Sequence, residues 1–222
     1  GADSPSDRLD DWALLSQDDP NYGTVQRPVE ISIKAKPVSL DPNGGWPFPH
    51  VKGYEVILTL PFPLMAGAEY LVGSLDSDLQ ETFILDPETQ WTPTLKVNQV
   101  GYLPEAPAKF AYAGYWAPGI SPIDLGEDVL SYRVINAEDA SVAHRGRMRL
   151  RSTHEQATED AYMTGYSLAN VYELDLFPLV NPGWYYIVWE GVGRSWTFRV
   201  SDDAYDEAFI TSFRGLYHHR CG

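Results

Sequence analysis

The alternation of apolar and polar residues predicts that most of this chain forms β-strands. Val29, Ile31 and Ile33 alternate with polar neighbours, which is the period of a strand with one buried face. Further apolar runs of similar length follow, and proline or glycine residues separate them. These runs predict strands at 54–60, 69–72, 82–85, 95–97, 109–115, 130–135, 148–151, 171–176, 184–189 and 195–200.

The predicted strands fall into two groups, so we expect two β modules. Residues 28–92 are expected to form a small antiparallel module. Residues 93–201 hold the second group, whose short and regular spacing is typical of a β-sandwich. Before both groups, residues 1–27 carry six aspartates and few apolar side chains, so we expect an acidic arm that is only partly ordered.

The spacing of apolar residues becomes helical after Ser201. Asp202 and Asp203 precede the repeat and Arg214 lies near its end, which matches the dipole of a helix. The repeat places large side chains on one stripe: Tyr205, Ala208, Phe209, Ser212, Phe213, Leu216 and Tyr217. No later element covers this stripe, and at about 25 cal/mol per Å² its exposure would forfeit several kcal/mol. We therefore expect a partner, and we interpret the chain as a fragment.

Strand 184–188 carries large apolar side chains on both faces. This pattern predicts either a central position in the sandwich or an outer face that another domain covers. The outward positions are Trp184, Tyr186 and Val188. Together with Phe209, Phe213 and Tyr217 on the helix, they are the residues that we expect at a domain interface.

Composition narrows the class of protein. Aromatic residues make up 13% of the chain, with 18 glycines and 17 prolines, which favours strands and turns. The net charge of -15 argues against a nucleic-acid partner, because the field repels polyanions. No apolar run approaches the ~20 residues of a membrane-spanning helix. The single cysteine, Cys221, excludes an internal disulfide.

Three motifs together resemble the amino-terminal part of family 9 glycoside hydrolases, the cellulase type. Residues 95–104 read LKVNQVGYLP, like the opening strand of the immunoglobulin-like domain in that family. Residues 191–209 read GVGRSWTFRVSDDAYDEAF, like its closing strand and domain junction. Residues 214–222 read RGLYHHRCG, like the first helix of the catalytic barrel. The order and distances fit over residues 94–222, whereas residues 1–93 match weakly, as an extra β module.

The resemblance implies an all-β chain of two antiparallel β-sandwich modules, the second immunoglobulin-like, followed by one α-helix of an (α/α)6 barrel at residues 202–222. It implies inverting hydrolysis of β-glycosidic bonds by two carboxyl groups ~6.5–9.5 Å apart. The family's aspartate pair and glutamate lie beyond this sequence, so no catalytic residue is expected here and the chain alone should be inactive. A secreted or periplasmic enzyme is implied.

Two residues are candidates for ligand binding. Cys221 resembles a cysteine that, in some members of the family, joins a structural zinc site, here to be completed by the missing chain; a free thiol is the alternative. Calcium is implied only for the missing catalytic domain. Trp46 lies in a loop rich in glycine and proline, where an indole is available to stack on a sugar ring, whereas packing is expected for the other tryptophans.

Several polar groups are interpreted as structural. The pairs Asp10-Asp11 and Asp18-Asp19 resemble catalytic carboxylates only in composition, because adjacent residues face apart. Asp18 and Asp19 also lack the spacing of a calcium loop. Asn98 is expected to bond backbone groups at a strand end.

The sequence therefore predicts the non-catalytic amino-terminal part of an endoglucanase-like family 9 enzyme. Its expected partners are a catalytic (α/α)6 domain, covalently joined or a second chain after cleavage, and a neutral β-glycan. Neither nucleic acid nor a membrane is expected. The alternatives are a stand-alone carbohydrate-binding module and an adhesion-type sandwich, against which the carboxy-terminal helix argues.

Overall fold

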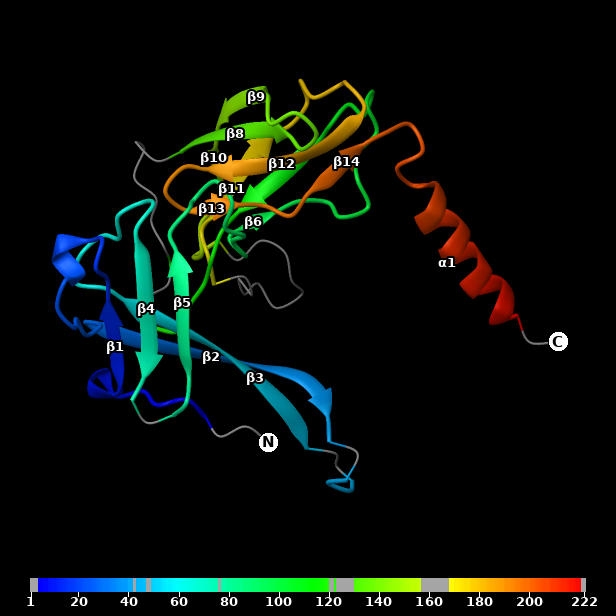
Figure 1. Ribbon diagram of the computed structural model, residues 1–222. Coiled ribbons are helices and arrows are strands. Elements are labelled where there is room, and N and C mark those ends of the chain that lie inside the picture. The colour runs from blue at the N-terminus through cyan, green and yellow to red at the C-terminus, as the bar shows by residue number, and fades with distance from the viewer. Residues whose placement is uncertain are drawn as a thin grey trace. The chain divides into compact units, whose positions relative to one another are not determined.

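The computed structural model describes residues 4–41, 43–46, 49–75, 77–119, 122, 130–156 and 168–220 (Figure 1). The chain divides into two compact units. The first unit contains residues 1–86 and 116–121, and the second contains residues 87–115 and 122–222.

Within its described residues, the first unit holds a three-stranded antiparallel sheet and a two-stranded ribbon. The sheet has the order β1-β4-β5, with β1 at Trp12–Leu15, β4 at Glu69–Ser74 and β5 at Gln80–Ile84. The ribbon pairs β2 (Glu30–Leu40) with β3 (His50–Thr59). Short 3-10 helices cover Leu9–Asp11 and Pro20–Tyr22. The core of this unit consists of Leu14, Tyr22, Ala68 and Tyr70, packed by Leu60, Leu64, Val72, Phe83 and Leu85.

The prediction of an acidic arm at residues 1–27 is wrong for the part that the structure describes. β1 pairs with β4 in the register Leu14 to Val72, and Leu14 exchanges two backbone hydrogen bonds of 2.8 Å with Gln26. Trp12, Leu14 and Tyr22 are buried. The low average hydrophobicity concealed these few apolar residues, which are spaced so that they fall on the core side of the sheet.

A segment from the middle of the sequence completes the first unit. Residues 116–119 lie against β2, where the Ser32 hydroxyl donates to the Pro118 carbonyl. The Lys34 ammonium donates to the Trp116 carbonyl at 3.2 Å and lies 5.3 Å from the centre of the Trp116 ring. The first unit is therefore assembled from two stretches of chain that are far apart in sequence.

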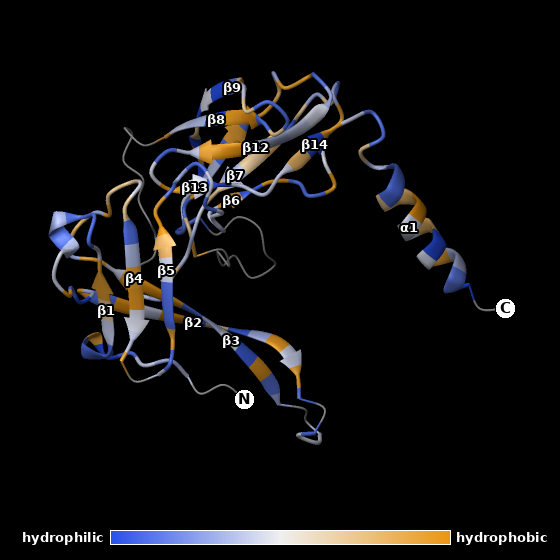
Figure 2. Ribbon diagram, in the orientation of Figure 1, coloured by the Kyte–Doolittle hydropathy of each residue, from blue (hydrophilic) through white to orange (hydrophobic). Residues whose placement is uncertain are grey.

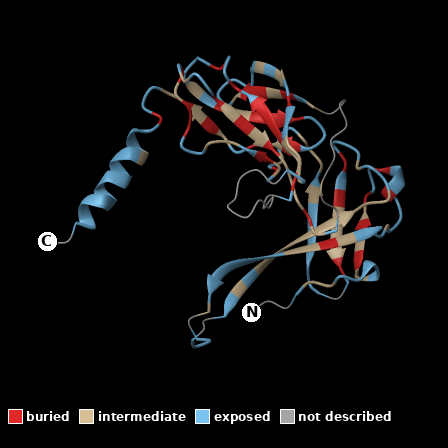
Figure 3. Ribbon diagram, turned by 180° about the vertical axis from the view of Figure 1, so that it is seen from behind, coloured by how far each residue is buried: buried red, intermediate tan, exposed pale blue. Residues whose placement is uncertain are grey.

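The described part of the second unit is a sandwich of two antiparallel sheets. One sheet has the order β10-β11-β7-β6, and the other has the order β13-β12-β8-β9, with β14 also paired to β12. Both sheets contribute to one core, and apolar and buried residues are concentrated on their strands (Figures 2 and 3). Leu174, Ile187 and Phe198 of this core are 0% exposed. The strands are β6 (Leu95–Lys96), β7 (Phe110–Ala113), β8 (Ser131–Asn136), β9 (Val142–Arg147), β10 (Arg149–Ser152), β11 (Val171–Asp175), β12 (Gly183–Trp189), β13 (Gly193–Arg194) and β14 (Phe198–Val200).

The predicted all-β fold with a closing helix is confirmed. In the second unit, β9 and β14 are two of the strands that differ from the prediction. β9 was not predicted, because its residues 142–147 are mostly polar and it lies at the edge of its sheet. The strand predicted at 195–200 begins only at Phe198, because the amide of Ile187 donates to the Ser195 hydroxyl at 2.9 Å and not to a backbone carbonyl, which interrupts the regular pairing.

The helix α1 spans Asp206–His218, as the periodicity predicts. It begins later than expected because residues 201–205 form turns, with the amide of Ala204 bonded to the Ser201 carbonyl at 3.2 Å. Among the described residues, no helix has both the length and the apolar character needed to cross a membrane.

Candidate functional site: exposed aromatic surfaces

The most prominent exposed surface is the apolar stripe of α1. All thirteen residues of the helix are described and none is buried (Figure 3). Phe209 and Phe213 are 67% and 61% exposed, and their rings stack with centres 5.9 Å apart. Leu216 and Tyr217 extend the stripe and are also exposed. The predicted interface residues of the helix are therefore available to a partner.

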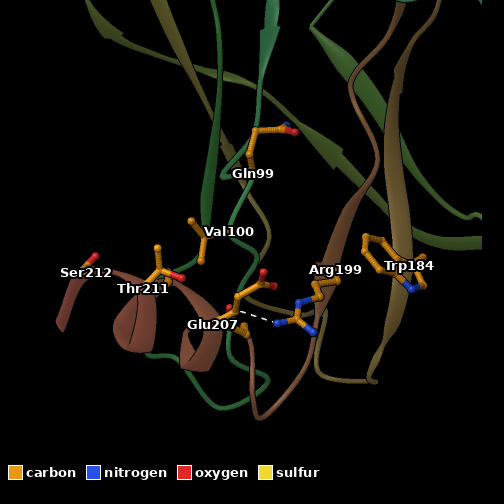
Figure 4. Close-up of a pocket in the computed structure, with 9 residues that line it drawn as sticks. Gln99, Val100, Trp184, Arg199, Glu207, Thr211 and Ser212 are labelled. Atoms are coloured by element: carbon orange, nitrogen blue, oxygen red, sulfur yellow. Dashed lines mark hydrogen bonds between the residues drawn. The ribbon is translucent and has the colours of Figure 1, made fainter. Parts of the chain in front are cut away.

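An open groove of ≈ 570 Å³ lies between α1 and the strands β12 and β14 (Figure 4). Arg199 of β14 closes one side of it and donates to the Ala204 carbonyl at 3.2 Å, the dashed line in Figure 4. The Arg199 guanidinium also pairs with Asp203 at 3.3 Å. The Ser201 hydroxyl, and then Arg199, lower the pKa of the Asp203 carboxyl. These contacts hold the turn that leads from the sandwich into α1.

The outer face of β12 agrees only in part with the predicted interface. β12 is central in its sheet, between β8 on one side and β13 and β14 on the other. Trp184 is 50% exposed and lines the groove, and Tyr186 is half-buried beneath the Arg194 guanidinium, 4.6 Å from its ring centre. Val188 is only 1% exposed, so its place among the interface residues is corrected: it offers no surface to a partner.

Trp46 lies in the loop that joins β2 to β3 and is 89% exposed. It is thus the most exposed large apolar side chain of the described residues. The structure places it in the first unit, whereas the α1 stripe and Trp184 belong to the second unit. The candidate sugar contact and the candidate domain interface are therefore carried by different units.

The acidic residues of the N-terminal segment hold the fold together. The Asp18 carboxylate accepts the amide of Glu69 at 3.1 Å. Asp19 is 2% exposed and accepts the amide of Asn21 at 2.9 Å and the hydroxyl of Tyr70 at 2.6 Å. The bond from Tyr70 is the main cause that lowers the pKa of Asp19. These carboxylates therefore anchor the start of the chain to β4.

The described residues contain no group of three His, Cys, Asp or Glu side chains placed to hold a metal ion. Cys221, the candidate zinc ligand, lies outside the described residues. Asn98 makes the predicted backbone contacts, since its side chain donates to the Gly101 carbonyl at 2.8 Å and accepts the amide of Val100 at 3.0 Å.

One exposed aromatic contact escaped prediction. Trp91 and Trp196 are 49% and 56% exposed, and their ring centres lie 5.2 Å apart with 42° between the planes. Both belong to the second unit. The only signal in the sequence is their position beside Thr-Pro and Thr-Phe pairs at two module ends, which does not show that they meet.

The comparison with known families decides the identity of the sandwich. The model of the cellulase N-terminal ig-like domain matches residues 90–194, which span most of its strands. Residues 90–194 form a cellulase N-terminal Ig-like domain. This Ig-like domain includes the opening motif on which the family resemblance rests, and the closing motif begins within it.

Similar proteins are much longer than this chain. Endoglucanase D of Acetivibrio thermocellus is 24% identical over 156 residues, which cover 68% of this chain and 21% of that enzyme. Two solved structures are similar over part of the chain. A metagenome-derived glycoside hydrolase family 9 endoglucanase is 26% identical, with a TM-score of 0.43 over 58% of this chain and 21% of its own. A family 9 protein of Bacteroides ovatus is 19% identical, with a TM-score of 0.40 over 56% and 18%.

Proposed function

We propose that this chain is the non-catalytic N-terminal part of a family 9 glycoside hydrolase of the endoglucanase type. The observation that carries the proposal is the Ig-like domain at 90–194, followed after β14 by a helix whose apolar stripe is exposed. The similarity covers only about a fifth of endoglucanase D. In this proposal the hydrolytic part lies in sequence outside these 222 residues.

In this proposal the chain supports the catalytic part through α1 and Trp184. The four stripe residues Phe209, Phe213, Leu216 and Tyr217 are 58–72% exposed. At ~100 Å² each they offer ~400 Å², about half of one partner's share of a standard interface. Burying that area is worth about 10 kcal/mol before the costs of association. This surface suits a permanent contact with a neighbouring domain.

The finer assignments follow from the family resemblance and stand as proposals. The catalytic (α/α)6 domain would follow α1, either covalently or as a second chain after cleavage. It would carry the two carboxyl groups of an inverting mechanism and a calcium ion, and Cys221 would complete a structural zinc site with it. Trp46 would contact a neutral β-glycan. The enzyme would be secreted or periplasmic.

The proposal is tested by comparing residues 1–222 with the longest polypeptide that the native gene encodes. We expect hydrolysis of barley β-glucan by the longer polypeptide and none by residues 1–222. In the longer polypeptide, the double variant Phe209→Ser with Phe213→Ser should lower the temperature at which activity is lost, whereas the neighbouring Arg214→Ser should not. Hydrolysis by residues 1–222 alone, or a native polypeptide that ends at residue 222, would contradict the proposal.

The exposure of Trp46 also favours a second candidate, a stand-alone carbohydrate-binding module. This candidate predicts that residues 1–222 retain glucan binding without any further chain and that Trp46→Ala abolishes it. It further predicts that the stripe variants leave every measured property of the native polypeptide unchanged, because no catalytic part would rest on α1.

A further inference from the structure

The Trp91–Trp196 contact is a second exposed aromatic surface of the Ig-like unit. The two rings touch, yet each keeps about half of its surface in solvent, at 49% and 56%. Among the described residues, neither ring belongs to the buried cluster that forms the core of the sandwich.

The backbone holds both rings in place. Residues 90–92 run parallel to β13 and pair with it, because the amide of Thr92 donates to the Arg194 carbonyl at 2.9 Å and the amide of Arg194 donates to the Gln90 carbonyl at 2.7 Å. Gly193 has φ +137° beside this pairing, and a Cβ there would lie 2.8 Å from the Gln90 carbonyl oxygen. The close pairing therefore requires glycine, and it sets the backbone position of Trp91.

Trp196 is held in the same way from the other side. The neighbouring Ser195 is 0% exposed, and its amide bonds the Ile187 carbonyl at 2.8 Å. The Ser195 hydroxyl accepts the amide of Ile187 and donates to the carbonyl of Trp196 at 2.7 Å. The backbone on both sides of the ring pair is therefore fixed by hydrogen bonds, which favours a preorganised binding surface.

We propose that Trp91 and Trp196 bind a β-linked glucan by stacking on its sugar rings. The proposal rests on the proposed function, which supplies the class of ligand. Two aromatic side chains of ~150–250 Å², each half exposed, present ~200 Å² together, which is far below the ~800 Å² that each partner contributes to a stable protein interface. The exposed aromatic area therefore fits contact with one or two sugar rings and is too small for a stable protein interface.

The α1 stripe provides the contrast. It is larger and mixes aromatic with aliphatic side chains such as Leu216 on an exposed helix, which is the composition of a protein contact. The Trp91–Trp196 surface is purely aromatic and lies where two β segments are hydrogen-bonded to each other. The two surfaces thus sort into a protein contact and a sugar contact by size, composition and rigidity.

The experiment follows the indole N–H signals of the seven tryptophans of residues 1–222 during titration with cellohexaose and with barley β-glucan, and with dextran as an α-linked control. Trp91→Phe and Trp196→Phe assign the two signals. We expect these two signals to shift with the β-linked ligands and not with dextran. Affinity electrophoresis in barley β-glucan should show about tenfold weaker retardation for the Trp91→Ala, Trp196→Ala double variant, with Trp184→Ala as the matched control.

The outcomes separate this proposal from the others. Folding of the double variant is checked by circular dichroism, and Trp196→Phe, which keeps an aromatic ring, should retain part of the binding. The proposal is overturned if wild-type residues 1–222 bind no β-glucan, if the double variant binds as wild type, or if Trp46→Ala alone removes the binding. Binding by the pair together with a native polypeptide that hydrolyses no glucan would contradict the proposed function and leave this inference intact.

Discussion

Removing the hydroxyl of Tyr102 tests how the opening motif of the Ig-like domain is stabilised. Tyr102 is 5% exposed, and its ring packs edge-on against Phe198 with centres 5.4 Å apart. The hydroxyl accepts the amide of Asn98 at 3.0 Å and donates to the Phe110 carbonyl at 2.7 Å. Tyr102→Phe preserves the ring and leaves both backbone groups without this partner. We expect the free energy of unfolding to fall by about 1–3 kcal/mol at pH 8.

The same hydroxyl gives the domain a specific alkaline response. Burial raises the pKa of Tyr102 from its ordinary value of 10.0 to about 12. Because the folded state holds the proton more tightly, this contribution is complete below pH 10 and is lost as the pH rises from 10 to about 12, at about 1.4 kcal/mol per pH unit. Tyr102→Phe cannot ionise, so its unfolding free energy should decline less steeply by that amount. Burial also raises the pKa of Tyr132 to about 12. The unfolding free energy of both proteins therefore keeps the part of its decline with pH that Tyr132 causes.

The assay is urea unfolding at intervals from pH 8 to pH 11, followed by circular dichroism and tryptophan fluorescence. Tyr217→Phe is the matched control, because Tyr217 is 58% exposed on α1 and should change the free energy by less than about 0.5 kcal/mol. An unfolding free energy within that margin of wild type for Tyr102→Phe, together with an unchanged alkaline slope, would refute the reasoning.

Three further predictions concern other buried polar groups. Ser32→Ala removes the bond to Pro118 and should lower the stability of the first unit by about 1–2 kcal/mol, with faster amide exchange over residues 116–119 and unchanged exchange in β12. The lowered pKa of Asp19 stabilises the folded state above pH 3.8, the ordinary pKa of the group, and this stability is lost as the pH falls. Asp19→Asn should therefore lose less stability on acidification than wild type. An acid titration followed by fluorescence measures the difference, and identical acid-unfolding curves for the two proteins would contradict the prediction. Ser195→Ala leaves two backbone groups without their partner and should cost about 1–3 kcal/mol in urea unfolding, whereas Ser195→Thr should recover part of the loss.

The elements were predictable where a local period sets them. The alternation at residues 29–33 indicates β2, and the i, i+3, i+4 spacing after Ser201 indicates α1, because both periods follow from backbone geometry alone. The exposure of Trp46 was also predictable, since the surrounding glycines and prolines mark its position as a loop.

Other features depend on which strands pair. β1 escaped prediction because only its pairing with β4 brings Trp12 and Leu14 into a core. Val188 belongs to an apolar face that the sequence assigns to an interface, yet it is buried within the chain.

The amino-acid sequence by itself determined the type of most elements and the Ig-like character of the second module, which the match at residues 90–194 confirms. Only the tertiary structure decided that residues 116–119 complete the first unit and that Trp91 meets Trp196. The physical reason is range: hydrophobic period and turn chemistry act over a few residues, whereas burial and ring contact depend on partners about a hundred residues away, which only the folded chain brings together.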